Sequence, residues 1–170
     1  MSVTIRPARP EDTPVVVDLI RRLAEYERLA HEAEASEAGI AAALFGDTPR
    51  VFCEIAEADG EVAGFALWFY TFSTFAGRHG IYLEDLFVKP EFRGQGVGKA
   101  LLQHLARRCV DEGLGRFEWS VLDWNEPAIQ FYRSQGAHVL DEWVKCRVDG
   151  DALRELGATP QASASTGDER

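Results

Sequence analysis

The sequence has few cysteines and no long apolar run. Its 170 residues include only three cysteines, Cys53, Cys109 and Cys146, which lie far apart. An odd number of widely spaced cysteines fits neither a disulfide framework nor a zinc site, so we expect no metal centre. No apolar stretch reaches the roughly 18 residues that cross a bilayer, and residues 1–6 lack the apolar core of a secretory signal. These features predict a soluble cytoplasmic protein without a membrane partner.

Basic side chains are also scarce. The chain has 18 Lys and Arg against 28 Asp and Glu, a formal net charge of −10. Proteins that bind nucleic acids use an excess of basic side chains to neutralise phosphates, so no nucleic-acid partner is expected. The acidic excess either attracts cationic ligands or only keeps the protein soluble, and composition does not choose between the two.

The composition that remains is that of one globular domain. Apolar residues make up 46 % and charged residues 27 %, as in ordinary folded proteins. We expect one domain over residues 1–156 and a disordered tail over residues 157–170, which are small, polar and without periodicity.

Strand-like and helix-like periods alternate along this domain. Strands are expected over residues 3–6, 51–57, 61–71, 81–88 and 116–122, with one or two more within 138–148. Helices are expected from Thr13 and over residues 36–44, 97–112 (with Val110 inward) and 126–135. This order predicts an α/β (α+β) fold, a central mixed sheet with helices on both faces.

A glycine-rich loop between a strand and a helix carries the most specific signal. The strand ends near Val88, Pro90 blocks its extension, and Gly94, Gly96 and Gly98 then open a helix. Glycine lets the backbone curl closely around a ligand, and the helix start offers free N–H groups with partial positive charge. Together they form a phosphate-sized anion site.

Two positive side chains, Arg93 and Lys99, flank this loop. The spacing of its glycines fits neither a P-loop nor a dinucleotide fingerprint. A glycine-rich turn that binds nothing remains the alternative on spacing alone.

The motif Arg93-x-x-Gly96-x-Gly98 resembles the pyrophosphate loop of the GNAT superfamily of N-acetyltransferases. Four further segments resemble its diamine (spermidine/spermine) acetyltransferase branch, in the right order: residues 5–8, 23–27, 82–88 and 124–132. The resemblance covers residues 3–156. It implies the GNAT fold, whose sheet is mostly antiparallel with splayed parallel strands, and acetyl-CoA as co-substrate.

The resemblance also implies which residues hold acetyl-CoA. The backbone of Leu86, Phe87 and Val88 would bind the pantetheine arm, and an N–H near Val88 would polarise the acetyl carbonyl. Asn125, Ala128 and Tyr132 would contact the arm from the next helix. The pyrophosphate would lie on Arg93, Gly94, Gln95, Gly96, Val97, Gly98 and Lys99.

Tyr132 is the expected general acid. A phenol titrates near pH 10 and a thiol near 8.5, so proton donation to a leaving thiolate is efficient. The alternative is that Phe131 and Tyr132 only pack their helix.

Glu84 and Asp85 are adjacent carboxylates within an apolar strand, where alternation predicts that they face opposite sides. An ordinary ion pair with a helix arginine stays open for Asp85, because a buried unpaired carboxylate is costly. For Glu84 the resemblance implies the amine site. A gap of about six pKa units argues against direct proton removal from an ammonium. We therefore expect Glu84 to bind and orient the amine and to pass its proton to water.

The resemblance places Tyr26 and Glu27 at the far end of the amine, with Glu118, Trp119 and Ser120 lining its site. A carboxylate at each end of a cleft suits a molecule with two ammonium groups. Glu27 could instead be a solvated helix charge, and Trp119 and Trp124 could pack the core.

The sequence thus predicts acetyl transfer to a primary amine of a small polyamine, diamine or lysine-like substrate such as thialysine, by direct attack in a ternary complex. Residues 71–79 and 138–143 depart from the branch, which leaves substrate length open. The alternatives are a non-catalytic acyl-CoA-sensing or binding module and a protein or peptide N-acetyltransferase. The resemblance also implies a homodimer completed by strands at residues 143–148.

Overall fold

The structure, a computed structural model, describes residues 2–158. The described residues divide into two units, one that ends at Asn125 and one that begins at Glu126. The first contains the sheet, three α-helices and three short 3-10 helices, and the second contains α4 and α5. Within residues 2–158, no helix combines the length and apolar character that crossing a membrane requires. The single domain expected over residues 1–156 stays a prediction.

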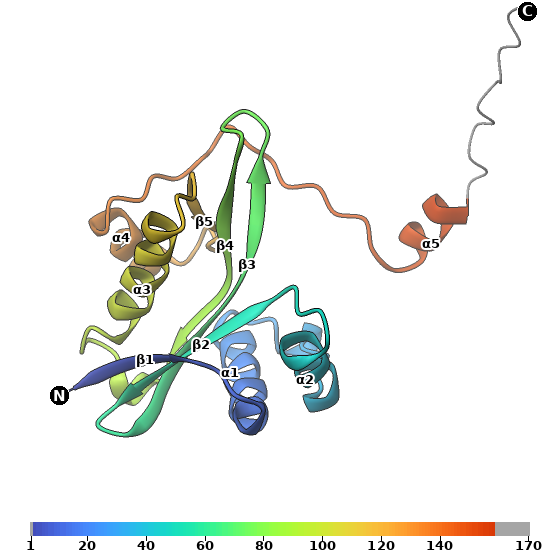
Figure 1. Ribbon diagram of the computed structural model, residues 1–170. Coiled ribbons are helices and arrows are strands. Elements are labelled where there is room, and N and C mark those ends of the chain that lie inside the picture. Colours follow the sequence, from blue (N-terminus) through green and yellow to red (C-terminus); the bar gives the residue numbers. More distant parts are fainter. Residues whose placement is uncertain (1, 159–170) are drawn as a thin grey trace, which may run out of the picture. The chain divides into compact units, whose positions relative to one another are not determined.

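The first unit is built on a five-stranded sheet in the order β1-β2-β3-β4-β5 (Figure 1). Neighbouring strands from β1 to β4 run antiparallel, and β5 runs parallel to β4. The expected mixed, mostly antiparallel sheet is therefore confirmed. The strands are β1 Val3–Pro7, β2 Phe52–Ala58, β3 Glu61–Ser73, β4 Arg78–Val88 and β5 Phe117–Trp119.

A two-residue turn fixes the register of β2 against β3. Asp59 and Gly60 have φ values of 50° and 87° and join the paired residues Ala58 and Glu61. Two successive positive φ values match the twist of a hairpin, so this short link turns the chain directly from β2 into β3.

Helices α1 (Thr13–Tyr26) and α2 (Glu37–Phe45) cover one face of the sheet. Ser36 caps α2, since its side chain accepts a hydrogen bond from the Gly39 N–H at 3.1 Å. The main core lies under these helices. It is formed by Val16, Leu19, Leu23, Leu44, Cys53, Ile55, Phe65, Leu67 and Phe87.

Helix α3 (Val97–Asp111) covers the opposite face (Figure 1). Leu101 and Leu105 are fully buried, but Val110, which was expected to point inward, is 78 % exposed. Cys109 is buried in its place. The reason is the helical period, because position 109 lies one turn beyond Leu105 and position 110 is rotated away by about 100°.

The short 3-10 helices are η1 (Pro10–Asp12), η2 (Ala30–Glu32) and η3 (Pro90–Phe92). The third of them, η3, matters most here because it lies between β4 and α3. Pro90 ends β4 as the sequence predicted, and η3 leads directly into the glycine loop.

The structure of the second unit differs from the prediction of strands within residues 138–148. Residues 138–149 contain no strand and are exposed along their length, so the one or two strands expected within 138–148 are wrong. A strand needs a neighbour for its backbone N–H and C=O groups, and apolar alternation alone does not supply one. Helix α5 (Gly150–Ala158) was not expected. It includes the first two residues of the expected tail, and residues 159–170 lie outside the described residues.

Gly64 on β3 offers a strong test of the sheet. A Cβ at this position would lie 2.4 Å from the Phe87 carbonyl oxygen and 3.2 Å from the Val88 Cα. We expect Gly64→Ala to lower the free energy of unfolding by about 2–4 kcal/mol, because backbone atoms of β4 must move. Urea denaturation measures this change.

Gly60→Ala is the matched control. Gly60 has φ +87° with nothing within 4 Å of its added Cβ, so only backbone strain of about 1 kcal/mol is expected. Equal losses for the two variants would contradict the close approach of β3 to β4.

Candidate active site

The sheet opens where β4 and β5 separate. The two strands pair in parallel only at Ile81–Phe117, Tyr82–Glu118 and Leu83–Trp119. Strand β4 then continues to Val88, whereas β5, which was expected over residues 116–122, ends at Trp119. Among residues 2–158, the β5-facing backbone of β4 from Glu84 onward therefore has no strand neighbour, so a ligand can pair with it.

A β-bulge at this opening changes the direction of two carboxylates. Trp68 pairs with Leu83 and Leu67 pairs with Asp85, so Glu84 is the extra residue of β4. The prediction that Glu84 and Asp85 face opposite sides is therefore wrong. An extra residue breaks the alternation of side chains, and both carboxylates lie on the face that α1 covers.

The bulge places Asp85 beside other negative charges. Burial, together with Glu84 and Glu27, raises the pKa of Asp85 to about 7. Burial also raises the pKa of Glu27, so Glu27 is not a fully solvated helix charge. Within residues 2–158, Asp85 forms no ion pair, and the helix-arginine partner that the sequence left open is not present.

The end of α1 positions Glu27. Arg28 follows it with φ 62°, a left-handed conformation that a non-glycine residue seldom adopts. The Leu29 N–H bonds the Ala24 carbonyl at 2.8 Å, which closes the helix in the manner of a Schellman motif. This sharp end fixes Glu27 close enough to Asp85 to affect its pKa.

Contacts between α1 and residues 124–125 form one rim of the opening. The Tyr26 hydroxyl donates to Asn125 Oδ1 at 3.2 Å, and Asn125 is only 7 % exposed. The Arg28 guanidinium lies 4.5 Å from the centre of the Trp124 ring. Trp124 is 43 % exposed and is not a core residue. The structure thus joins the expected amine-site residue Tyr26 to the expected cofactor residue Asn125.

The glycine loop has the backbone that an anion site needs. Gly94 and Gly96 have φ values of 73° and 83°, and Gly96 caps α3. A Cβ added at either residue would have no atom within 4 Å, so the space beside both glycines is open. The first N–H groups of α3 have no partner within the helix and lie behind these glycines. The loop therefore fits the diphosphate that the resemblance implies.

Two side chains of the loop, Arg93 and Gln95, donate hydrogen bonds to backbone carbonyls that precede the loop. Arg93 Nε donates to the Val88 carbonyl at 2.9 Å, and its guanidinium lies 5.0 Å from the centre of the Tyr26 ring. Gln95 Nε2 donates to the Glu91 carbonyl at 2.9 Å. Lys99 is exposed. Arg93 thus connects the loop to the end of β4.

The expected substrate residues of β5 divide between the two faces. Alternation places Glu118 with Tyr82 and Glu84, and it places Trp119 on the α3 face. Glu118 forms an ion pair with Arg116 at 2.9 Å. The Ser120 hydroxyl lies 2.6 Å from the Tyr82 hydroxyl. Glu118 and Ser120 are therefore on the carboxylate side of the opening, and Trp119 is not.

The remaining expected site residues belong to the second unit. Ala128 and Tyr132 lie on α4 (Glu126–Ser134), as the sequence predicted, and Gly136 with φ 90° follows its end. Tyr132 and Phe131 are each partly buried, with ring centres 5.5 Å apart. The roles of Ala128 and Tyr132 stay predictions.

Sequence reasoning missed Asp85 and Arg28. Two adjacent carboxylates in an apolar strand were the available signal, but no residue type in β4 marks the bulge that brings them to one face. Arg28 gave no signal, because glycine or asparagine is the usual residue in its conformation. Within residues 2–158, no three His, Cys, Asp or Glu side chains are grouped so as to hold a metal ion.

Comparison with known proteins relates the sequence to one family. Residues 16–137 match the model of the acetyltransferase (GNAT) family. Thialysine N-epsilon-acetyltransferase of Sus scrofa is 41 % identical over 166 residues, which cover 91 % of this chain and 97 % of the relative. L-ornithine N5-acetyltransferase NATA1 of Arabidopsis thaliana is 34 % identical, with 89 % and 86 % covered.

A solved structure also matches. An integron cassette protein from the mobile metagenome of V. cholerae superimposes with a TM-score of 0.78 at 29 % identity, covering 94 % of this chain and 99 % of that one.

Proposed function

The chain belongs to the acetyltransferase (GNAT) family and is an N-acetyltransferase, and from this premise we propose that it acetylates the terminal amine of a small diamino substrate. Acetyl-CoA would be the donor, and the amine would attack the acetyl carbonyl directly in a ternary complex. Lysine-like amino acids are the favoured class, since the relatives named above act on thialysine and L-ornithine. Both compounds carry two amino groups.

The observation that carries this proposal is the group of carboxylates at the sheet opening. Glu27, Glu84 and Asp85 are close enough for the first two to raise the pKa of the third. An ammonium group placed among them would remove this repulsion and would form charge-assisted hydrogen bonds. A substrate with two ammonium groups fits such a site better than one with none.

The chain's own residues would position the two substrates. The free edge of β4 over Leu86, Phe87 and Val88 would bind the pantetheine arm, and the loop from Gly94 to Lys99 would bind the diphosphate. Because Arg93 now occupies the Val88 carbonyl, that side chain would move toward the diphosphate when acetyl-CoA binds. Asn125 and Ala128 would flank the arm.

Glu84 and Tyr132 would act in the two proton transfers of the reaction, at the amine and at the leaving thiolate. Glu84 would hold the ammonium until it loses a proton to water, since a carboxylate is too weak a base to remove that proton directly. Tyr132 would donate a proton to the departing thiolate.

The pKa of Asp85 gives a prediction of stability against pH. That pKa is raised from 3.8 to about 7, so between these values the folded chain holds a proton that the unfolded chain releases. The stability contributed by this proton is present below pH 4 and is lost as the pH rises through 7. We expect Asp85→Asn, which cannot ionise, to be more stable than the parent at about pH 8 by roughly 1–3 kcal/mol.

Urea denaturation at about pH 4 and about pH 8 measures this effect. The two proteins should differ little at the lower pH. A difference that is the same at both pH values would contradict the buried, repelled carboxylate.

A thiol-release assay over a panel of amines tests the proposed function. The panel contains thialysine, L-ornithine, putrescine, spermidine and an aminoglycoside, each with acetyl-CoA. We expect the diamino acids to give a kcat/KM at least about tenfold above the aminoglycoside. Absence of thiol release with every amine would favour the acyl-CoA-sensing alternative. Residence in the cytoplasm and assembly as a homodimer stay predictions.

A further inference from the structure

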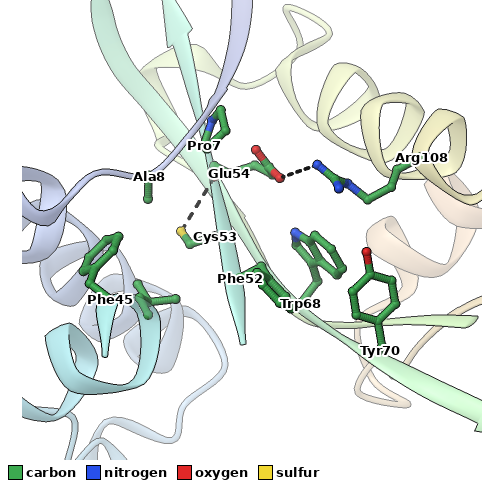
Figure 2. Close-up of a pocket in the computed structure, with 10 residues that line it drawn as sticks. Pro7, Ala8, Phe45, Phe52, Cys53, Glu54, Trp68, Tyr70 and Arg108 are labelled. Carbon is green, nitrogen blue, oxygen red and sulfur yellow. Dashed lines mark hydrogen bonds and ion pairs between the residues drawn. The ribbon is translucent and has the colours of Figure 1, made fainter. Parts of the chain in front are cut away.

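A pocket of about 260 Å³ lies at the edge of β2, away from the opening between β4 and β5 (Figure 2). It forms where β1 ends at Pro7, opposite Glu54, and the chain turns away toward α1. None of its lining residues belongs to the candidate active site. They are Pro7, Ala8, Leu44, Phe45, Phe52, Cys53, Glu54, Trp68, Tyr70 and Arg108.

The polar side of this pocket contains a buried carboxylate, that of Glu54, and one of its oxygens accepts no hydrogen bond. The Glu54 side chain is 3 % exposed, and its neighbours His104 Nε2 and Arg108 Nη2 each lie 3.7 Å from a carboxylate oxygen. These distances are too long for hydrogen bonds. Within the described part of the chain, Glu54 Oε2, Trp68 Nε1 and Arg108 Nε are buried and have no hydrogen-bond partner. Such groups normally have a partner, because leaving them without one is costly.

The charges around Glu54 leave it incompletely neutralised. Arg108 Nη1 lies 3.0 Å from Glu112 Oε1, and the Tyr70 hydroxyl donates to Glu112 Oε2 at 2.7 Å. The Arg108 guanidinium therefore pairs more closely with Glu112 than with Glu54. Two carboxylates face one permanent cation, and the imidazole of His104 is a further neighbour of Glu54. The buried thiol of Cys53 also lies close enough to Glu54 for the two to interact electrostatically. Burial raises the pKa of Glu54, and this effect outweighs the opposing influence of His104, Arg108 and the nearby Trp68 N–H.

Aromatic rings form the wall beside this carboxylate. The Phe52 and Trp68 ring centres are 4.8 Å apart, and those of Trp68 and Tyr70 are 5.1 Å apart. Arg108 already places its guanidinium carbon 5.0 Å from the centre of the Trp68 ring. Ring faces of Trp, Tyr and Phe attract cations, and a carboxylate among them completes the usual recognition of organic ammonium groups.

We propose that this pocket is a second binding site, specific for a primary alkylammonium ion. The ammonium would donate to Glu54 Oε2, and the alkyl chain would lie against Phe52 and Trp68 (Figure 2). The charge-assisted hydrogen bond would satisfy the buried oxygen. A single water would also satisfy that oxygen, but it would gain nothing from the aromatic wall. The site stands whether or not the proposed function is correct.

Titration with n-butylammonium chloride tests the proposal, with potassium chloride at equal ionic strength as the reference. The readout is the NMR signal of the Trp68 indole N–H, assigned by its loss in Trp68→Phe. The full chain carries Glu84→Gln, so that binding at the candidate active site is weakened and the two sites are distinguished. We expect a saturable shift of this signal, and a weakening of binding by at least about tenfold when Glu54→Gln is added.

Three comparisons make the result decisive. Glu57→Gln changes a carboxylate of the same strand that bonds Arg6 instead, and it should leave the titration unchanged. Phe52→Leu keeps the carboxylate but removes one ring, and it should weaken binding even if Glu54→Gln fails to fold. n-Butanol should give no saturable shift. The proposal is overturned by a flat Trp68 titration, which indicates water only, by an equal response to butanol, or by affinity that neither pocket variant lowers.

Discussion

Glu84→Gln is expected to lower kcat/KM for the amine substrate by about 100- to 1,000-fold while leaving the affinity for acetyl-CoA nearly unchanged. Glutamine keeps the size of the side chain but removes the charge that holds an ammonium at the opening of the sheet. Glu84 is the extra residue of the bulge, so no cross-strand pairing depends on it, and the fold should tolerate the change. Steady-state kinetics with a diamine and calorimetry with coenzyme A measure the two quantities.

Glu61→Gln is the matched control, because Glu61 is an exposed carboxylate at the start of β3. It should retain the parent kcat/KM. If Glu84→Gln remains as active as the parent, or if it loses affinity for coenzyme A in the same proportion, Glu84 does not hold the amine.

Tyr132→Phe is expected to lower kcat by about 100-fold with little change in KM. Removing the hydroxyl takes away a proton donor for the leaving thiolate and leaves the aromatic ring in place. Loss of activity at alkaline pH, which a phenol of pKa about 10 would cause, should also disappear in the variant. This pH profile separates an acid from a residue that only packs α4.

Ser134→Ala removes a different hydroxyl from the same helix, one that bonds the Phe131 carbonyl at 2.6 Å. It should leave kcat unchanged. A Tyr132→Phe variant with full kcat and an unaltered pH profile would assign Tyr132 to packing alone.

The cluster of Glu27, Glu84 and Asp85 shows which site residues the sequence could predict and which needed the structure. The sequence indicated Glu84 and Glu27 through their resemblance to family positions, and Pro90 with the alternate glycines predicted a strand end, a loop and a helix start in the right place. For Asp85 the sequence left an ordinary ion pair with a helix arginine open, and strict alternation placed it on the face opposite Glu84. The bulge is a property of two strands in register, and a single strand's residues do not encode it locally.

The prediction of strands within residues 138–148 was wrong for a related reason. Val139, Leu140, Trp143 and Val144 are apolar enough to suggest strands, yet they are 45–86 % exposed. Strand formation depends on a neighbour that supplies hydrogen bonds, and apolar side chains do not reveal whether one is present.

By itself the sequence determined the elements of the sheet and its helices, the glycine loop and the family, because periodicity, turn residues and short motifs act over a few neighbouring positions. Only the tertiary structure decided that three carboxylates share one face, that Tyr26 meets Asn125, and that Glu54 is buried beside an aromatic wall. Each of these depends on segments far apart in the chain, and packing alone brings such segments together.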